Sequence, residues 1–391
     1  MSLGRCVSIV TNWSIRALLA CAPFWLWGQL MFASPSGASL PAVRIELGNC
    51  GYTKHKPHYK EHVHLSDVPL DENARLALSG RTLAIYFSDW SAQKMEALFV
   101  DVDSGKCVAR RSWPIAKRVG LNDSADTQAR ILVTSGGFLV HTSATLALYS
   151  ASLELITTYP LGGYGTPFSK RGDPRGWSVR VAPGGKVIHV QPLTSQRSDQ
   201  SIWMDAVTLK ELGTQIHRAG VETVSENAIV TRMGQGLMID EKNSGPHDLC
   251  SVEACKGLPE TLNNEEVLVL GRTGFTVVST HGDQLWQRTA RQFWTKDFFI
   301  DSHSRSLTGK HFAIVVGTIG NASFDGSKVA RDPKRSILVY DCACRSKVLD
   351  VSVSADEAPG SDISLDDGRL VVLSGTTVSI YPLPNTRCGG Q

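Results

Sequence analysis

The 391-residue chain shows little helical periodicity. After about residue 40, apolar residues do not recur every three or four positions, as they do in an amphipathic helix. Runs of five or more like charges are also missing, and 40 Lys+Arg nearly balance 37 Asp+Glu for a net charge of +3. This balance gives no electrostatic reason to expect a nucleic acid or an anionic membrane surface as a partner.

Common catalytic and nucleotide-binding signatures are missing as well. The chain has no Gly-x-Ser-x-Gly elbow, no P-loop, and no strand-Gly-x-Gly-x-x-Gly-helix unit. Ser, His and Asp are too common here to define a catalytic triad from sequence alone. We therefore predict no catalytic residues, no cofactor-binding residues and no cofactor.

The first 38 residues read as an export segment. Arg5 and Arg16 precede an apolar stretch over 17–33, and small residues fill 34–39. A positive start, an apolar middle and a small-residue end are typical of a secretory signal peptide. We predict a signal peptide over 1–38 and a secreted or periplasmic protein. An uncleaved N-terminal membrane anchor is the alternative, because the apolar stretch approaches the length of a membrane span.

The rest of the chain consists of short β-type runs, rich in Val, Ile, Leu, Thr and aromatic residues, between turns of Gly, Asp, Asn and Ser. One hairpin, a small or polar turn followed by an apolar strand, recurs at a mean period of roughly 48 residues, and a four-stranded propeller blade takes about 40–50. Its seven copies begin at Ser79, Ser135, Pro183, Ser225, Asn264, Thr308 and Asp366.

A second hairpin follows each of the first six copies, as over residues 98–108 and 147–156. We assign it to the third and fourth strands of each blade. The last repeat ends near residues 381–384, before such a hairpin is complete. A closed ring can borrow the missing strand from the opposite terminus, because an unpaired edge is a liability. Residues 42–47 and 62–68 are the candidates for that strand.

Two of these hairpins carry a family resemblance. Residues 101–113 (DVDSGKCVARRSW) and 281–289 (HGDQLWQRT) resemble hairpins of YVTN-type and quinoprotein-like propellers, which belong to the WD40-like class of repeats. The resemblance covers about residues 43–384 and implies architecture alone. The chain lacks the WD dipeptide and the Gly-His pair of WD40 blades. The tryptophan docking pattern is present in at most two blades, so the resemblance does not imply a bound quinone.

We therefore predict an all-β fold with a single β-propeller domain over 39–391. Seven four-stranded blades fit the repeat count, and six or eight are the alternatives. We expect an N-terminal strand to close the ring.

Nine cysteines occur, and seven of them follow the export segment. An exported chain permits disulfides. Cys250 and Cys255 bracket a short loop and are the most direct predicted pair. Cys50 and Cys388 fall near the predicted seam of the ring, so we expect them to approach each other. An odd total leaves one thiol free or paired between chains.

Histidines are concentrated in one segment before the first blade. Neutral imidazole is a good ligand for zinc or copper, and alternate residues of a strand share a face. The candidate metal ligands are therefore His55, His58, His62 and His64. The alternative is an exposed, lysine-spaced segment without a metal.

Two function classes remain open. The first is a non-catalytic binding or scaffolding module for a protein, peptide or glycan, with no nucleic acid and no membrane contact beyond the export segment. The second is a propeller enzyme, such as a hydrolase, lactonase or lyase, whose site lies at the mouth of the central channel. Sites there assemble from loops of different blades, which sequence spacing hides. Converging acidic, amide or histidine side chains would favour the enzyme, and a plugged channel would favour binding.

Overall fold

A computed structural model describes most of the chain after the export segment. Its described residues are 40–52, 74–89, 92–115, 129–142, 145–161, 177–192, 199–217, 220–234, 236–242, 245–250, 257–271, 274–289, 298–318, 335–353, 362–386 and 388. They form twenty-eight strands and one 3-10 turn, η1 (Leu47–Cys50). No helix within these ranges is long and apolar enough to cross a membrane. The predicted export segment and the histidine-rich segment lie outside them.

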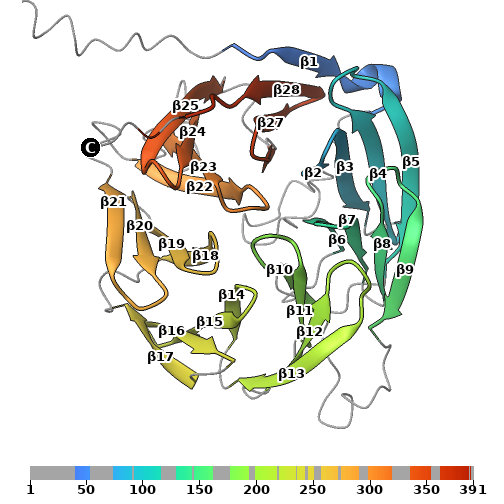
Figure 1. The fold of residues 1–391 in the computed structure, drawn as a ribbon. Helices are drawn as coiled ribbons and strands as arrows, with labels where there is room; N and C mark the ends of the chain where they lie inside the picture. Colours follow the sequence, from blue (N-terminus) through green and yellow to red (C-terminus); the bar gives the residue numbers. More distant parts are fainter. Residues whose placement is uncertain are drawn as a thin grey trace, which may run out of the picture. The chain divides into compact units, whose positions relative to one another are not determined.

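The strands form seven four-stranded antiparallel sheets arranged as the blades of a ring (Figure 1). In blades 1 to 6 the chain runs from the innermost strand to the outermost. Blades 1 to 3 comprise β2 (Arg75–Ser79), β3 (Thr82–Asp89), β4 (Lys94–Asp101), β5 (Cys107–Pro114); β6 (Arg130–Thr134), β7 (Gly137–His141), β8 (Thr145–Tyr149), β9 (Leu155–Pro160); β10 (Trp177–Val181), β11 (Val187–Pro192), β12 (Asp199–Asp205) and β13 (Glu211–His217).

Blades 4 to 6 repeat this order. They comprise β14 (Val221–Val224), β15 (Ala228–Met233), β16 (Gly236–Glu241), β17 (Gly245–Cys250); β18 (Leu258–Thr261), β19 (Glu266–Gly271), β20 (Gly274–Ser279), β21 (Gln284–Thr289); β22 (Phe298–Arg305), β23 (His311–Thr318), β24 (Arg335–Asp341) and β25 (Ser346–Val353). Each copy of the first predicted hairpin joins the first and second strands of a blade, and each copy of the second joins the third and fourth.

Blade 7 combines strands from the two ends of the described part of the chain. It contains β26 (Asp362–Leu365), β27 (Arg369–Ser374), β28 (Thr377–Pro382) and, as its outermost strand, β1 (Val43–Glu46). In the antiparallel pair of β1 with β28, Ile45 lies opposite Val378. The predicted count of seven blades and the predicted closure by residues 42–47 are both confirmed. The other candidate strand, 62–68, lies outside the described residues.

The hydrophobic core lies between the blades. Leu83 and Ile85 of β3 pack into a cluster shared with blade 7, whereas Ala84 and Tyr86, which alternate with them, pack into one shared with blade 2. Seven such clusters occupy the seven interfaces between blades. Successive residues of a strand point to opposite faces, so the middle strands of each blade have near-continuous apolar sequences.

The disulfides correct one prediction. Cys50 is bonded to Cys107 and Cys344 to Cys388, so Cys50 and Cys388, the predicted candidates at the seam, do not form a disulfide with each other. After β1, η1 carries the chain toward the outer strand of blade 1, whereas the segment after β28 returns to the β24–β25 turn of blade 6. Cys250 is also disulfide-bonded. Its predicted partner, Cys255, lies outside the described residues.

Glycines in the inner hairpins let neighbouring blades approach closely. Gly309 of blade 6 has φ +76°, and a Cβ atom there would lie 1.6 Å from the carbonyl oxygen of Leu262 in blade 5. Gly80, in the corresponding hairpin of blade 1, has φ +57° and no atom within 4 Å of a built Cβ. At both positions the backbone has a positive φ that disfavours a side chain. Only at Gly309 would an added Cβ atom also collide with a neighbouring blade.

We expect Gly309→Ala to lower the free energy of unfolding by more than about 3 kcal/mol. The alanine would have to adopt an unfavourable φ, and the backbone at Leu262 would also have to move away from the added Cβ atom. Gly80→Ala should cost only about 1–2 kcal/mol, the penalty of the left-handed conformation. Urea unfolding of both variants measures the difference. Equal losses would contradict close packing of blades 5 and 6 at this turn.

Candidate functional site

The outer strands of blades 1 to 6 share one irregularity. Each contains a β-bulge, in which one residue of the outer strand has no partner in the register of the third strand. The unpaired residue is apolar in every case. These residues are Val108, Ile156, Leu212, Leu249, Leu285 and Val348.

The bulge residues differ in exposure around the ring. Leu249 is fully buried, and Leu285 and Val348 pack partly buried against the interface clusters of their blades. In blades 1 to 3, by contrast, Val108, Ile156 and Leu212 are about half exposed, at 51%, 49% and 56%. The blade fold therefore does not force the bulge residue to be exposed, because three of the six blades cover it fully or partly.

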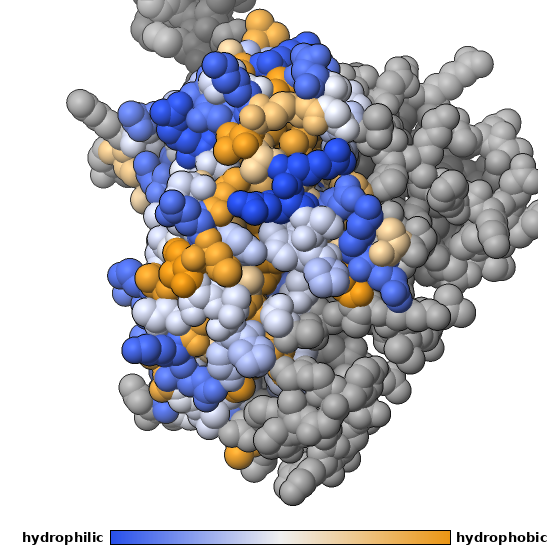
Figure 2. Space-filling model, turned by 90° about the vertical axis from the view of Figure 1, so that its right-hand side faces the viewer, coloured by the Kyte–Doolittle hydropathy of each residue, from blue (hydrophilic) through white to orange (hydrophobic). Residues whose placement is uncertain are grey.

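Six of the nine exposed large apolar residues in the described part of the chain belong to the outer strands and turns of blades 1 to 3. We call this set the outer apolar surface. It consists of Val108, Leu155, Ile156, Val207, Leu212 and Ile216. Figure 2 views the side of the ring that carries β5 and β9, and shows apolar groups set among charged ones.

Side-chain hydrogen bonds hold the outer parts of these three blades together. The indole Nε1 of Trp113 in β5 donates to the hydroxyl of Tyr149 in blade 2 over 3.1 Å. The hydroxyl of Tyr159 in β9 donates to Glu211 Oε1 in β13 over 2.6 Å. Burial, the hydrogen bond to Glu211 and its negative charge raise the pKa of Tyr159 to about 12, so this proton stays in place. These hydrogen bonds therefore hold the blades that carry the outer apolar surface in fixed positions relative to one another.

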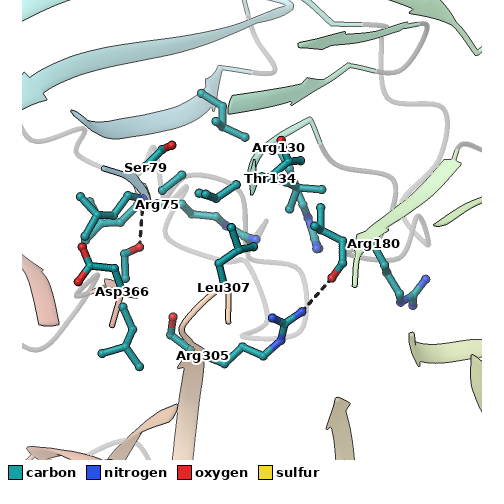
Figure 3. Close-up of a pocket in the computed structure, with 18 of the residues that line it drawn as sticks. Arg75, Ser79, Arg130, Thr134, Arg180, Arg305, Leu307 and Asp366 are labelled. Atoms are coloured by element: carbon teal, nitrogen blue, oxygen red, sulfur yellow. Dashed lines mark hydrogen bonds between the residues drawn. The ribbon is translucent and has the colours of Figure 1, made fainter. Parts of the chain in front are cut away.

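The central channel contains a pocket of about 720 Å³, lined by the innermost strands of all seven blades (Figure 3). Charged residues from all seven blades line it or its mouth. They are Arg75, Arg130, Arg180, Glu222, Glu260, Arg305, Asp366 and Asp367.

Blade 6 reaches blade 3 across this channel. The Arg305 guanidinium donates to the carbonyl oxygen of Val181 over 2.8 Å, drawn as a dashed line in Figure 3. One turn further on, the Gly184 N–H donates to the carbonyl oxygen of Leu307 over 2.5 Å. In a ring of seven, a contact between blades 3 and 6 leaves blades 7, 1 and 2 on one side and blades 4 and 5 on the other.

Acidic groups on the side of blades 4 and 5 take part in ion pairs. Glu260 accepts from Arg305 Nε over 2.7 Å and lies 3.6 Å from His303 Nε2. Burial alone would raise the pKa of Glu260, but the hydrogen bond from His303 and the charge of Arg305 outweigh it and lower that pKa to about 2. Glu222 pairs with Arg232 over 3.2 Å.

Polar groups also fasten blade 7 to blade 1 at the channel wall. Asp362 Oδ2 accepts the Leu76 N–H over 2.7 Å, and Ser364 Oγ accepts the Leu78 N–H over 3.2 Å. Burial raises the pKa of Asp362 to about 6, although the backbone hydrogen bonds and the charge of Arg75 oppose the shift. Much of the polar lining thus joins neighbouring blades.

One group of metal-ligand types occurs elsewhere. Oxygen or sulfur atoms of Asp341, Cys344 and Cys388 lie within 4.8 Å of one another. The two sulfurs form a disulfide, so neither offers the thiolate that would bind a metal. The metal ligands predicted from sequence lie outside the described residues: His55, His58, His62 and His64.

The sequence interpretation missed both the channel charges and the outer apolar surface. Arg75 and Arg130 lie just before the inner hairpin of their repeats, and the bulge residues lie just after the outer hairpin. Aligning the repeats on these flanking positions would have revealed both sets. Their exposure and direction depend on the neighbouring blades.

We expect Glu260→Gln to lower the free energy of unfolding by about 2–3 kcal/mol at pH 7, because it removes the charge that pairs with Arg305 and His303. The pKa of Glu260 is lower in the folded state than its unfolded value near 4.5, so the Glu260 charge stabilises the folded protein at pH values above about 4.5. The difference from the natural protein should therefore shrink as pH falls from about 5 toward 2. Denaturant unfolding across pH measures it.

Glu265→Gln is the matched control. Glu265 is exposed in the β18–β19 turn of the same blade. Its loss should cost under about 0.5 kcal/mol at pH 7. A pH-independent cost at Glu260, or an equal cost at Glu265, would contradict the assigned ion pair.

Comparisons with known proteins bear on the fold alone. No protein-family model and no curated protein matches the chain. Similar solved structures include RRP9 WD40 repeats, at 12% identity and a TM-score of 0.47, covering 81% of this chain and 99% of that one. Another is the WD40 domain of SCAP from fission yeast, at 9% identity and a TM-score of 0.42, covering 79% and 95%. The sheet order itself establishes the architecture: this chain is a seven-bladed β-propeller.

Proposed function

We propose that this protein is an exported, non-catalytic binding and scaffolding propeller, and that its partner is another protein that docks on the outer apolar surface. The observation that carries the proposal is the uneven exposure of one repeated position. The bulge residue is buried or half-buried in blades 4 to 6 and exposed in the three consecutive blades 1 to 3. Exposed apolar groups that cluster on one face are typical of interaction sites.

The chemistry of this surface favours a protein over a glycan. Its exposed side chains are all aliphatic, so they suit the apolar side chains of a partner, and burying them contributes about 25 cal/mol per Å² removed from water. Lys106, Arg110 and Arg111 lie exposed beside Val108. Glu154 and Glu211 lie exposed beside Leu155 and Leu212, so we expect the partner to present apolar residues flanked by charges of both signs.

The contacts in the channel support binding over the alternative of an enzyme at its mouth. Arg305 and the Leu307 backbone bridge the channel, and the Glu260 carboxylate is held by Arg305 and His303. Groups committed to such pairs are poorly placed to exchange protons with a substrate. The channel wall is thus better suited to hold the ring rigid, as a scaffold requires.

We expect Ile156→Asp/Leu212→Asp to weaken partner binding at least tenfold, because charges would have to be buried at the centre of the contact. The test uses crosslinking in the cells that make the protein, identification of the crosslinked partner, and its affinity for purified variants. Met233→Asp is the matched control, since Met233 is 52% exposed but lies in blade 4. Equal weakening by the control, or an unchanged affinity in the double variant, would contradict the proposed surface.

Two observations that do not involve the outer apolar surface support export of the protein. The disulfides Cys50–Cys107 and Cys344–Cys388 support an oxidising compartment, where such bonds persist. Ser36 and Ala38 suit the −3 and −1 positions of a signal-peptidase site. N-terminal sequencing of the protein from the extracytoplasmic fraction should therefore begin at Ser39. A mature protein that retains residues 1–38 would favour the membrane anchor instead.

A further inference from the structure

The outermost strand of blade 3, β13, leaves one edge of its sheet unpaired. The strand order of this blade is β10-β11-β12-β13, and no other strand in the described part of the chain pairs with the outer side of β13. Figure 1 shows β13 along the circumference of the ring. An edge strand presents a row of backbone N–H and C=O groups, which can pair with a strand of another chain.

The outer strands of the other blades carry features that discourage such pairing. Charged residues, proline and a short length all protect an edge strand. Two adjacent arginines lie in β5, a proline and an aspartate in β17, an arginine in β21, and a lysine and an aspartate in β25, while β1 has four residues of which two are charged. The uncharged strand β9 ends in Pro160. By contrast, β13 has seven residues, no proline, and only uncharged residues between Glu211 and His217 at its two ends.

The sequence of β13 is complementary to itself when two copies run antiparallel. A register centred on Thr214 sets Thr214 opposite Thr214 of the second copy, and sets Leu212 opposite Ile216 at two symmetric places. Threonine pairs and apolar pairs are favourable between neighbouring strands. The same register sets Glu211 opposite His217, so like charges do not meet. A two-fold axis through Thr214 therefore generates compatible pairs along the whole strand.

The residues that would pair are exposed on the outside of the ring. Ile216 is 73% exposed, the most of any residue of the outer apolar surface, and Leu212 is 56% exposed. Thr214 is exposed as well, and shares a face of the strand with Ile216. Because the ring is convex, a second ring that adjoins it edge to edge meets the outer strand of a single blade. A second copy of β13 would thus reach this edge and cover part of both aliphatic side chains.

We propose that the protein forms a two-fold symmetric dimer in which β13 of one copy pairs antiparallel with β13 of the other. Two four-stranded blades then form one continuous sheet. The inference rests on the proposed function only in that Leu212 and Ile216 belong to the outer apolar surface. The aliphatic residues of blades 1 and 2 stay available to a different protein, so the dimer would present two copies of that docking surface.

Analytical ultracentrifugation of the full-length purified protein, over a wide range of concentrations, tests the dimer. We expect a concentration-dependent change from the mass of one chain to that of two. Ile216→Asp should weaken the dimer at least about tenfold, because a charge would lie opposite Leu212 in both symmetric pairs. Met233→Asp is the matched control in blade 4, with 52% exposure, and should leave the dimer unchanged. A protein that stays monomeric throughout, or equal weakening by both variants, would overturn the proposal.

A cysteine at the two-fold axis locates the contact. In Thr214→Cys, a short bis-maleimide should crosslink two copies, because the Cβ atoms of directly opposite residues lie only about 4.5–5.5 Å apart. Thr158→Cys, at an exposed threonine of β9, is the matched control and should give no crosslinked dimer. Dimers that are not crosslinked at position 214, or equal crosslinking at position 158, would overturn the proposed pairing.

Partner docking is measured separately, by the affinity for the crosslinked partner. A monomer that still binds this partner through the outer apolar surface would contradict only the dimer. A dimer that binds no other protein would contradict only the proposed function.

Discussion

Every blade of this protein has to bury both faces of its sheet, and the rest of the structure depends on that constraint. A four-stranded sheet with Leu83 and Ile85 on one face and Ala84 and Tyr86 on the other is insoluble alone and incomplete with one neighbour. Only a closed ring gives each blade two neighbours. The strand β1 is therefore essential beyond its four residues, because it completes the blade where the two ends of the ring meet.

Closure of the ring places different chemistry at its centre and at its circumference. The innermost strands converge, so polar groups on them meet across short distances and can fasten one blade to the next, as Asp362 does with the Leu76 N–H. The outermost strands diverge, and their surfaces face solvent. In blades 1 to 6, a bulge there turns one apolar residue of the outer strand out of the ladder. Whether a neighbour covers it then depends on the local packing of each blade.

The outer environment suits recognition of another protein. A rigid frame with aliphatic residues exposed on three consecutive blades suits a protein partner, whose own apolar side chains replace water on that face.

The sequence by itself predicted seven blades, with six or eight as alternatives, the order of their strands, and closure by an N-terminal strand at residues 42–47 or 62–68. Those features follow from local signals: the repeated turn at Ser79 and its later copies, and the missing last strand after residues 381–384. Cysteine pairing was decided by tertiary structure, because the path of η1 brings Cys50 to Cys107 and leaves Cys388 to Cys344. The exposure of Ile156 where Leu249 is buried was decided in the same way. Repeats specify how each blade is built, whereas contacts between blades, which join residues far apart in the chain, decide where each side chain points and what covers it.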